Sequence, residues 1–445
     1  MKSPAVLVIL LIAIIVCICP LAASAAVEEF KLDNGLKILF IEDHKIPLVT
    51  FQIWYRVGSI DEPAGKSGMS HFLEHLMFKG TPRYGTKVFS NLVQRKGGMD
   101  NAFTTRDYTM YYQTLPSDSI PLSIDLEADR MKNLLLDPKE LESERSVVME
   151  ERRMRYEDDP QNLLDEAVVA TSLEVQAYRK PVIGWMSEIL AIKRGDLADY
   201  YATYYSPDNA FIIISGDASP SKLMPLIKEK FGRIAPAGDR IKRVKTVEPA
   251  QQGEKIVYVE KESAELPSIV MAYHVPSFPD KDSAALDVLS SVLSGGKSSR
   301  LYRSLVYEKR IALDASADYS GLHRDPFLFE LSATAAPGKD VREIRKALLS
   351  EVERLAKDPP SDDEVQKAKN QVEAAFIFAR DSSYSEALYT GMFEVIGDWR
   401  LRDRYIGEIN AVTPEAVREV AARYLTEKNR TTGYLIPVKP GGASE

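Results

Sequence analysis

The chain has 445 residues, of which 45% are hydrophobic, 27% charged and 9% aromatic. This length and composition suffice for two to three packed domains and exclude an intrinsically disordered protein. The formal net charge is −8 and the sequence has no strong basic patch, so nucleic acid is not expected as a partner.

The N-terminal segment has the composition of a secretory signal peptide. Lys2 precedes an apolar run at 5–19, and Ala23-Ser24-Ala25 fits a cleavage site, so residues 1–25 are expected to be removed. The run is short for a transmembrane helix, and an uncleaved membrane anchor is the alternative. Both cysteines lie in this segment, so the mature chain has no disulfide or thiol nucleophile. These features predict a periplasmic or secreted bacterial protein.

The first half of the mature chain, 26–235, places short strands before longer helices. Asn34-Gly35 predicts a tight turn between two strands of a hairpin. Strands are expected at 28–32, 36–41, 49–56, 101–105, 108–115 and 210–215, and helices at 68–79, 87–95, 119–135 and 139–156. This order predicts an α+β fold, in which an antiparallel-rich sheet carries helices packed on one face.

The segment His71-Phe72-Leu73-Glu74-His75 falls within an expected helix. Residues four apart lie on the same face of a helix, so His71 and His75 can bind one metal ion. Glu74 lies beside that face, and two histidines with a carboxylate are the ligand set of catalytic zinc. The order H-x-x-E-H reverses the commoner zinc-protease order H-E-x-x-H. The alternative is a helix with two unrelated polar residues and an ion-paired glutamate.

A third metal ligand must come from elsewhere in the chain, and the helix at 139–156 is rich in glutamate. Glu144 and Glu151 are two turns apart on one face, whereas Glu150 is rotated by about 100° from Glu151. Periodicity therefore favours Glu144 and Glu151 over Glu150. The alternative is a solvated acidic face balanced by neighbouring arginines.

The second half of the chain repeats landmarks of the first. Three landmarks recur at an offset of 220 or 221 positions, namely Leu136-Asp137-Pro138 with Lys357-Asp358-Pro359, Tyr204 with Tyr424, and Asn209 with Asn429. The stretch 236–253 contains proline, glycine and charged residues, which indicates a linker. We therefore expect two homologous domains at 26–235 and 254–445, built as duplicated α/β sandwich halves.

The second half is expected to lack the metal site. Its predicted strands are 255–260, 268–274 and 430–436, and its first helix is 283–293. Aligning this helix with the histidine-bearing helix sets Asp287, Ser290 and Ser291 opposite His71, Glu74 and His75. The first half is therefore expected to contain the catalytic residues, and the second half is expected to enclose the substrate.

The histidine segment and the following Leu76-Met77-Phe78-Lys79-Gly80-Thr81 resemble the zinc signature of the pitrilysin and mitochondrial processing peptidase family. The resemblance extends over essentially the whole mature chain. The family's third ligand is a glutamate about 76 residues beyond the second histidine, and Glu151 lies 76 residues beyond His75. The resemblance implies that His71, His75 and Glu151 bind Zn²⁺, and that Glu144 is an acidic residue beside the zinc.

The implied activity is that of a zinc-dependent endopeptidase that hydrolyses peptides or unfolded polypeptides in a chamber. Glu74 would take the proton of the attacking water and deliver it to the leaving amine. The segment 100–104 resembles the family's edge strand, which implies that Asn101 and Ala102 pair with the peptide backbone of the substrate. The alternative for this segment is a turn that only leads into a strand.

The sequence departs from self-sufficient family members in the second half. Those members carry an arginine and, seven residues later, a tyrosine after a glycine-rich segment. The segment 294–302 resembles that glycine-rich segment, but the two positions hold Tyr307 and Asp314. This departure implies a heterodimer with a zinc-free second subunit, with a homodimer as the alternative. A non-catalytic assembly or peptide-binding subunit is a further alternative, against which the intact set of metal residues argues.

Overall fold

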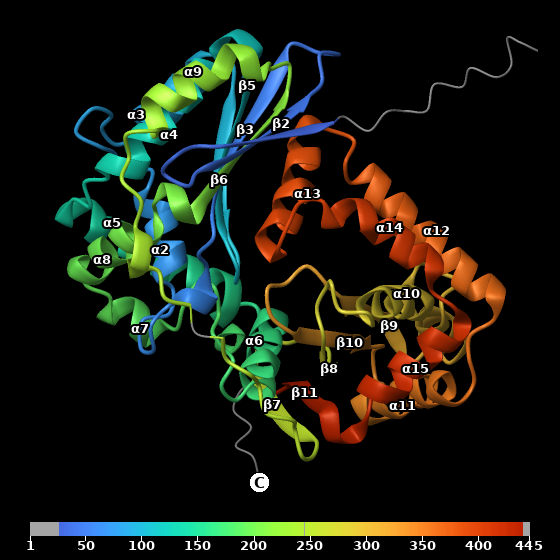
Figure 1. Ribbon diagram of the computed structural model, residues 1–445. Helices are drawn as coiled ribbons and strands as arrows, with labels where there is room; N and C mark the ends of the chain where they lie inside the picture. Colours follow the sequence, from blue (N-terminus) through green and yellow to red (C-terminus); the bar gives the residue numbers. More distant parts are fainter. Residues whose placement is uncertain (1–25, 244, 439–445) are drawn as a thin grey trace, which may run out of the picture.

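The computed structural model describes residues 26–243 and 245–438. The predicted signal peptide at 1–25 lies outside the described residues. Two β-sheets with surrounding helices form the two halves of the molecule (Figure 1).

The first sheet has six strands in the order β1-β2-β6-β3-β5-β4. The strands are β1 Val27–Lys31, β2 Lys37–Glu42, β3 Leu48–Tyr55, β4 Met99–Thr104, β5 Thr109–Pro116 and β6 Ala210–Gly216. β2 and β6 are parallel, and the other neighbouring strands are antiparallel. β1 and β2 form the predicted hairpin, in which Gly35 has a φ of 93°. Strand β4 lies at an edge of the sheet.

Helices of the first half cover one face of this sheet and enclose a large apolar core. The helices that follow the first strands are α2 Met69–Leu76, α3 Val88–Arg95, α4 Ile120–Asn133, α5 Pro138–Arg152, α7 Met186–Ala191, α8 Arg194–Tyr204 and α9 Pro220–Phe231. The helix predicted at 139–156 ends earlier than expected, because a π-helix at Arg153–Glu157 replaces its last turn.

The second sheet has five strands in the order β7-β11-β8-β10-β9. The strands are β7 Lys255–Lys261, β8 Ser268–Val275, β9 Ala312–Tyr319, β10 Phe327–Ala335 and β11 Arg430–Pro437. β11 and β7 are parallel and the other pairs are antiparallel, which repeats the pattern of the first sheet. The helices are α10 Ser283–Ser294, α11 Val341–Lys357, α12 Asp362–Phe378, α13 Ser383–Ile396, α14 Leu401–Ala411 and α15 Pro414–Tyr424. The predicted α+β class with antiparallel-rich sheets is confirmed.

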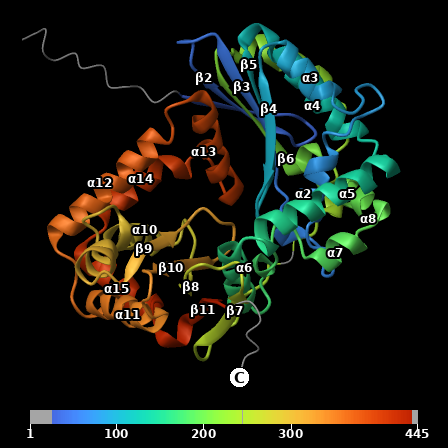
Figure 2. The same cartoon turned by 180° about the vertical axis from the view of Figure 1, so that it is seen from behind.

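One helix of each half packs on the sheet of the other half, on the face that the other half's own helices leave free (Figures 1 and 2). α6 (Pro160–Ser172) belongs to the first half but packs on the second sheet, where Leu164 and Val168 join a buried cluster with Val270 and Leu435. This exchange interlocks the two halves.

The reciprocal helix is α13, which packs on the first sheet. Its Ala387 and Val395 join a buried cluster with Trp54 and Phe211. Gly391 of α13 lies directly on the Trp54 ring, since a Cβ at this position would approach the ring to 2.3 Å. Within residues 26–243 and 245–438, no helix has the length and apolar character needed to cross a membrane.

Candidate metal centre

The helix that carries the histidines, α2, begins at a buried carboxylate. Gly68 precedes it with a φ of 90°, and its amide donates to Glu62 at 2.9 Å. The amide of Ser70 donates to the other oxygen of Glu62 at 2.8 Å. A negative charge beside the first turn stabilises the helix dipole, and these bonds satisfy amides without an intrahelical partner. Burial nevertheless raises the pKa of Glu62 to about 7.

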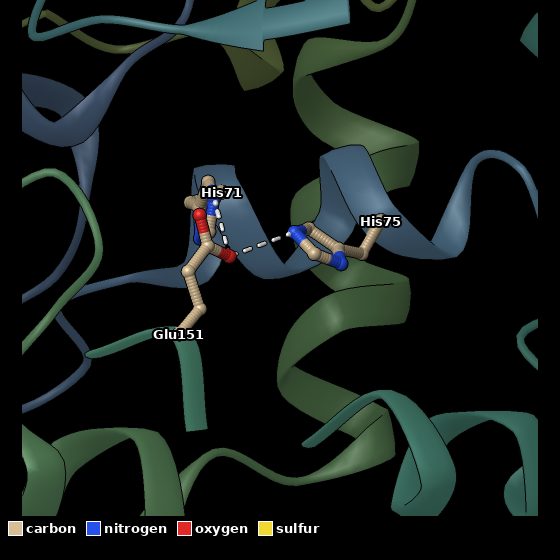
Figure 3. Close-up of side chains that lie close together, drawn as sticks. All are labelled: His71, His75 and Glu151. Carbon is tan, nitrogen blue, oxygen red and sulfur yellow. Dashed lines mark ion pairs between the residues drawn. The ribbon is translucent and has the colours of Figure 1, made fainter. Parts of the chain in front are cut away.

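Three side chains predicted as metal ligands converge in the structure. The Nε2 atoms of His71 and His75 lie 3.6 Å and 3.4 Å from Oε2 of Glu151 (Figure 3). One ligand atom from each residue falls within 4.8 Å of the others. Glu150 is turned away from the site and pairs with Arg153 at 2.9 Å.

The geometry of these three residues fits a tetrahedral zinc ion. Two ligand atoms about 2.1 Å from one ion at the tetrahedral angle lie about 3.4 Å from each other. The two nitrogen–oxygen distances at Glu151, 3.4 Å and 3.6 Å, match that separation. Burial and the neighbouring His75 lower the pKa of His71 to about 4, so this imidazole is neutral and keeps its lone pair for a metal.

A second carboxylate orients the other imidazole. His75 donates from Nδ1 to Glu144 at 3.1 Å, which leaves its Nε2 free to face Glu151. Burial lowers the pKa of His75, but the carboxylates of Glu151 and Glu144 outweigh burial and raise it. The other oxygen of Glu144 lies 2.5 Å from Nζ of Lys79. Metal-binding histidines in proteins are commonly held by such a carboxylate.

Glu74 lies beside the three converging residues and is largely buried. Burial raises its pKa above the usual range of a glutamate. The hydroxyl of Thr104, at the end of β4, donates to Glu74 Oε2 at 2.6 Å. Sequence reasoning missed Thr104, Lys79 and Arg155, the last of which lies 3.0 Å from the second oxygen of Glu151.

The predicted peptide-binding residues lie on β4, at the edge of the first sheet. Asn101 is exposed, whereas Ala102 is buried in the core beneath α2. Both pair with β5 on one side, opposite Tyr112 and Tyr111. The same strand ends at Thr104, so the edge that could pair with a peptide is joined to Glu74 by a hydrogen bond.

The corresponding positions of the second half form hydrogen bonds within that half. Asp287 is half-buried in α10 and accepts a hydrogen bond from the Tyr405 hydroxyl at 3.1 Å. Ser290 donates to the Ala317 carbonyl at 2.8 Å, and Ser291 donates to a side-chain oxygen at 3.1 Å. Tyr307 is exposed on the π-helix at Tyr302–Glu308, and Asp314 is exposed on β9.

Comparison with known proteins decides the family. The family model described as "Insulinase (Peptidase family M16)" matches residues 37–184, and the model described as "Peptidase M16 inactive domain" matches residues 191–372. The chain belongs to peptidase family M16. Zinc protease PqqE of Helicobacter pylori is 31% identical to this M16 chain over 412 residues, which are 92% of this chain and 93% of that protein.

Further relatives and solved structures agree with the M16 assignment. The probable mitochondrial-processing peptidase subunit beta of Arabidopsis thaliana is 24% identical over 92% of this chain and 78% of that protein. The crystal structure of a protease from Helicobacter pylori has a TM-score of 0.88 at 31% identity and covers 93% of this chain and 100% of that chain. The periplasmic protease PqqL from Escherichia coli shares the fold, with a TM-score of 0.77 at 18% identity over 93% of this chain and 48% of that chain. The names of the sequence relatives support a peptidase role and imply zinc.

Proposed function

We propose that this M16 chain is a zinc-dependent endopeptidase that hydrolyses peptides or unfolded polypeptides. The observation that carries the proposal is the convergence of His71, His75 and Glu151 beside Glu74. The first three residues would hold the metal. Zinc, when bound, supplies a Lewis acid and lowers the pKa of water to about 7.

The remaining residues of the site have roles that follow from their contacts. Glu74 takes a proton from the attacking water and returns it to the leaving amine, for which its raised pKa is suited. Thr104 holds one oxygen of Glu74 by its 2.6 Å hydrogen bond and leaves the other oxygen for the water. The edge of β4, at Asn101 and Ala102, would pair with the peptide backbone and place the scissile bond.

The decisive variant is Glu74→Gln, which keeps the shape of the side chain but cannot accept a proton. Zinc content should stay at the parental level, while the rate of peptide cleavage falls by about 100- to 10,000-fold. Glu150→Gln is the matched control, because Glu150 is exposed next to Glu151 and should leave the rate unchanged. Cleavage by Glu74→Gln at the parental rate would refute the proposed role. A parental protein that binds zinc without cleaving any peptide would favour an assembly or peptide-binding subunit.

The proposal extends to assembly with a second subunit. Tyr307 and Asp314 stand where self-sufficient members of the family carry an arginine and a tyrosine, so we propose that a zinc-free family member supplies those substrate contacts. The protein should be recovered from a periplasmic extract in a complex larger than its 49.8 kDa chain. The chain purified alone should cleave peptides slowly, and the second subunit should restore the rate. Full activity of an isolated monomer would contradict the heterodimer. Full activity of a complex that contains only copies of this chain would indicate the homodimer.

A further inference from the structure

A groove of about 1080 Å³ runs between α11 and β7 in the second half, far along the chain from the metal residues. Its apolar lining includes Ile256, Tyr258, Leu349, Tyr434 and Ile436. Ile256 is 51% exposed and Tyr258 is 63% exposed, and both lie on β7, the edge strand of the second sheet. Large apolar side chains that gather in such an exposed groove can mark a binding surface.

The internal duplication shows how the same place is filled in the first half. β7 pairs with β11 in the register with which β2 pairs with β6, so Ile256 and Tyr258 correspond to Ile38 and Phe40. Ile38 and Phe40 are both 0% exposed and lie in one apolar core with Ile227 of α9.

The helices α4 and α11, which cover the two sheets, show the same difference between a buried surface and an exposed one. α4 and α11 align at the offset of 221 positions that also relates Pro138 to Pro359. At this offset Ile124 and Ala128 of α4, which are buried in the core that α9 completes, correspond to Arg345 and Leu349, which line the groove. Among the described residues, no helix takes the place of α9 over α11 and β7.

Where α4 of the first half has an acidic residue, α11 of the second half has a basic one. Asp125 of α4 binds Lys230 of α9 at 2.8 Å. The residue of α11 at the same offset is Lys346, which is exposed and lines the groove. A helix could lie in this groove in the way that α9 lies on α4. To complement Lys346, that helix would need a carboxylate at the position where α9 has Lys230.

We propose that the groove between α11 and β7 binds an amphipathic helix of a partner protein. The apolar face of that helix packs on Tyr258 and Leu349, and a carboxylate on its flank pairs with Lys346. This mode is helix-in-groove recognition, in which apolar anchors at helical spacing supply affinity. The inference does not depend on proteolysis, because it concerns a surface that the metal residues do not touch.

A peptide taken from the chain itself tests the inference. The probe is a fluorescein-labelled peptide of residues 219–233, the α9 sequence, with Lys230→Glu, and its binding to the full-length protein is followed by fluorescence anisotropy. Saturable binding is expected, and the same peptide with the native lysine should bind about threefold more weakly, as for an exposed ion pair. With the protein variant Lys346→Glu, the order of the two peptides should reverse.

Two surface variants show whether the probe occupies the groove. Tyr258→Ser should weaken binding at least about tenfold, because it removes an aromatic anchor. Phe378→Ser is the matched control, since Phe378 is 76% exposed at the end of α12, outside the groove, and binding should not change.

Several outcomes would overturn the inference. They are the absence of saturable binding, binding that Tyr258→Ser leaves intact, and no reversal of peptide preference in Lys346→Glu. Self-association of the chain that Tyr258→Ser disperses would assign the groove to a second copy instead. Binding that begins only after removal of residues 439–445 would assign it to the chain's own C-terminal segment.

Discussion

Lys79 contacts the proposed metal centre only through Glu144. Its Nζ lies 2.5 Å from one oxygen of Glu144, and the other oxygen accepts the hydrogen bond of His75 Nδ1 at 3.1 Å. The lysine thereby compensates the charge of a largely buried carboxylate and fixes its orientation. The orientation of that carboxylate in turn sets the direction of the imidazole lone pair.

The variant Lys79→Met should weaken zinc binding by about 10- to 100-fold, the usual effect of removing a partner of a ligand. Competition with a chromophoric chelator measures this affinity whether or not the protein cleaves peptides. In a Glu144→Gln background the same substitution should have a much smaller effect, because the partner of Lys79 has already changed. Lys132→Met, an exposed substitution on α4, is the control. Equal losses in both backgrounds would show that Lys79 acts elsewhere.

The sequence contains enough to find some of these residues and not others. His71 and His75 are one helical turn apart, and Glu144 and Glu151 are two turns apart, so local periodicity sets each pair on one face. Lys79 is four residues beyond His75 in the predicted helix, but this spacing does not identify its partner Glu144 on another helix. Thr104 shows no such signal, because its importance comes from a partner that only the folded chain brings within hydrogen-bond distance. Thr104 ends a strand, and nothing in its neighbours predicts that α2 presents Glu74 to it.

At the scale of elements, the exchange of α6 and α13 depends on tight packing at one glycine in each case. Gly433 of β11 lies under α6, where a Cβ would approach Val168 to 2.2 Å. Gly391 of α13 lies on Trp54, which is fully buried between α13 and the first sheet. A side chain at either position would push a borrowed helix away from the sheet.

Gly391→Ala should therefore destabilise the protein although alanine favours helices. Overpacking of a buried site costs about 1–3 kcal/mol, whereas replacing a helical glycine by alanine gains about 1 kcal/mol. The clash should prevail, because the nearest atoms belong to a buried indole ring at 2.3 Å that has no room to turn. Gly407→Ala in α14 is the control, since a Cβ there meets nothing within 4 Å and should be neutral or stabilising. Urea unfolding measures both, and equal behaviour would contradict the packing argument.

The limits of sequence reasoning are also visible at this scale. The strand and helix positions follow from hydrophobic periodicity, and most predicted ends lie within a few residues of those observed. Helices α6 and α13 were not among the predicted elements, and hydrophobic periodicity alone does not show which sheet a helix packs against. The π-helix at Arg153–Glu157 was also not predicted, because no pattern of residue types distinguishes it from an α-helix.

At the scale of the whole molecule, the duplication explains both the likeness and the difference of the halves. Both sheets place a parallel pair next to antiparallel strands, and each receives a helix from the other half. Among the described residues, the second half has no counterpart of the proposed metal ligands and no counterpart of α9. The sequence repeat predicted the common plan, whereas the groove between α11 and β7 depends on which helices cover each sheet in the folded chain.

Glu254 anchors the start of the second half to the rest of that half. It lies just before β7, and its carboxylate accepts hydrogen bonds from Arg345 of α11 at 2.9 Å and from Arg430 and Thr432 of β11 at 2.7 Å each. Burial alone would raise the pKa of Glu254, but these donors outweigh it and hold the pKa at about 2. The carboxylate therefore binds its proton less readily in the folded protein than in the unfolded chain.

The pH dependence of stability follows from that difference. A carboxylate whose pKa is lower in the folded state contributes stability above its unfolded pKa of about 4.5, and the contribution is lost as pH falls toward about 2. Glu254→Gln should therefore lower the melting temperature at pH 7 and approach the parental value as pH falls from about 4.5 to about 2. Thermal unfolding across this range measures the effect, with Glu419→Gln, an exposed substitution on α15, as the control. A difference in melting temperature that stays constant with pH would mean that Glu254 acts by its shape and not by its charge.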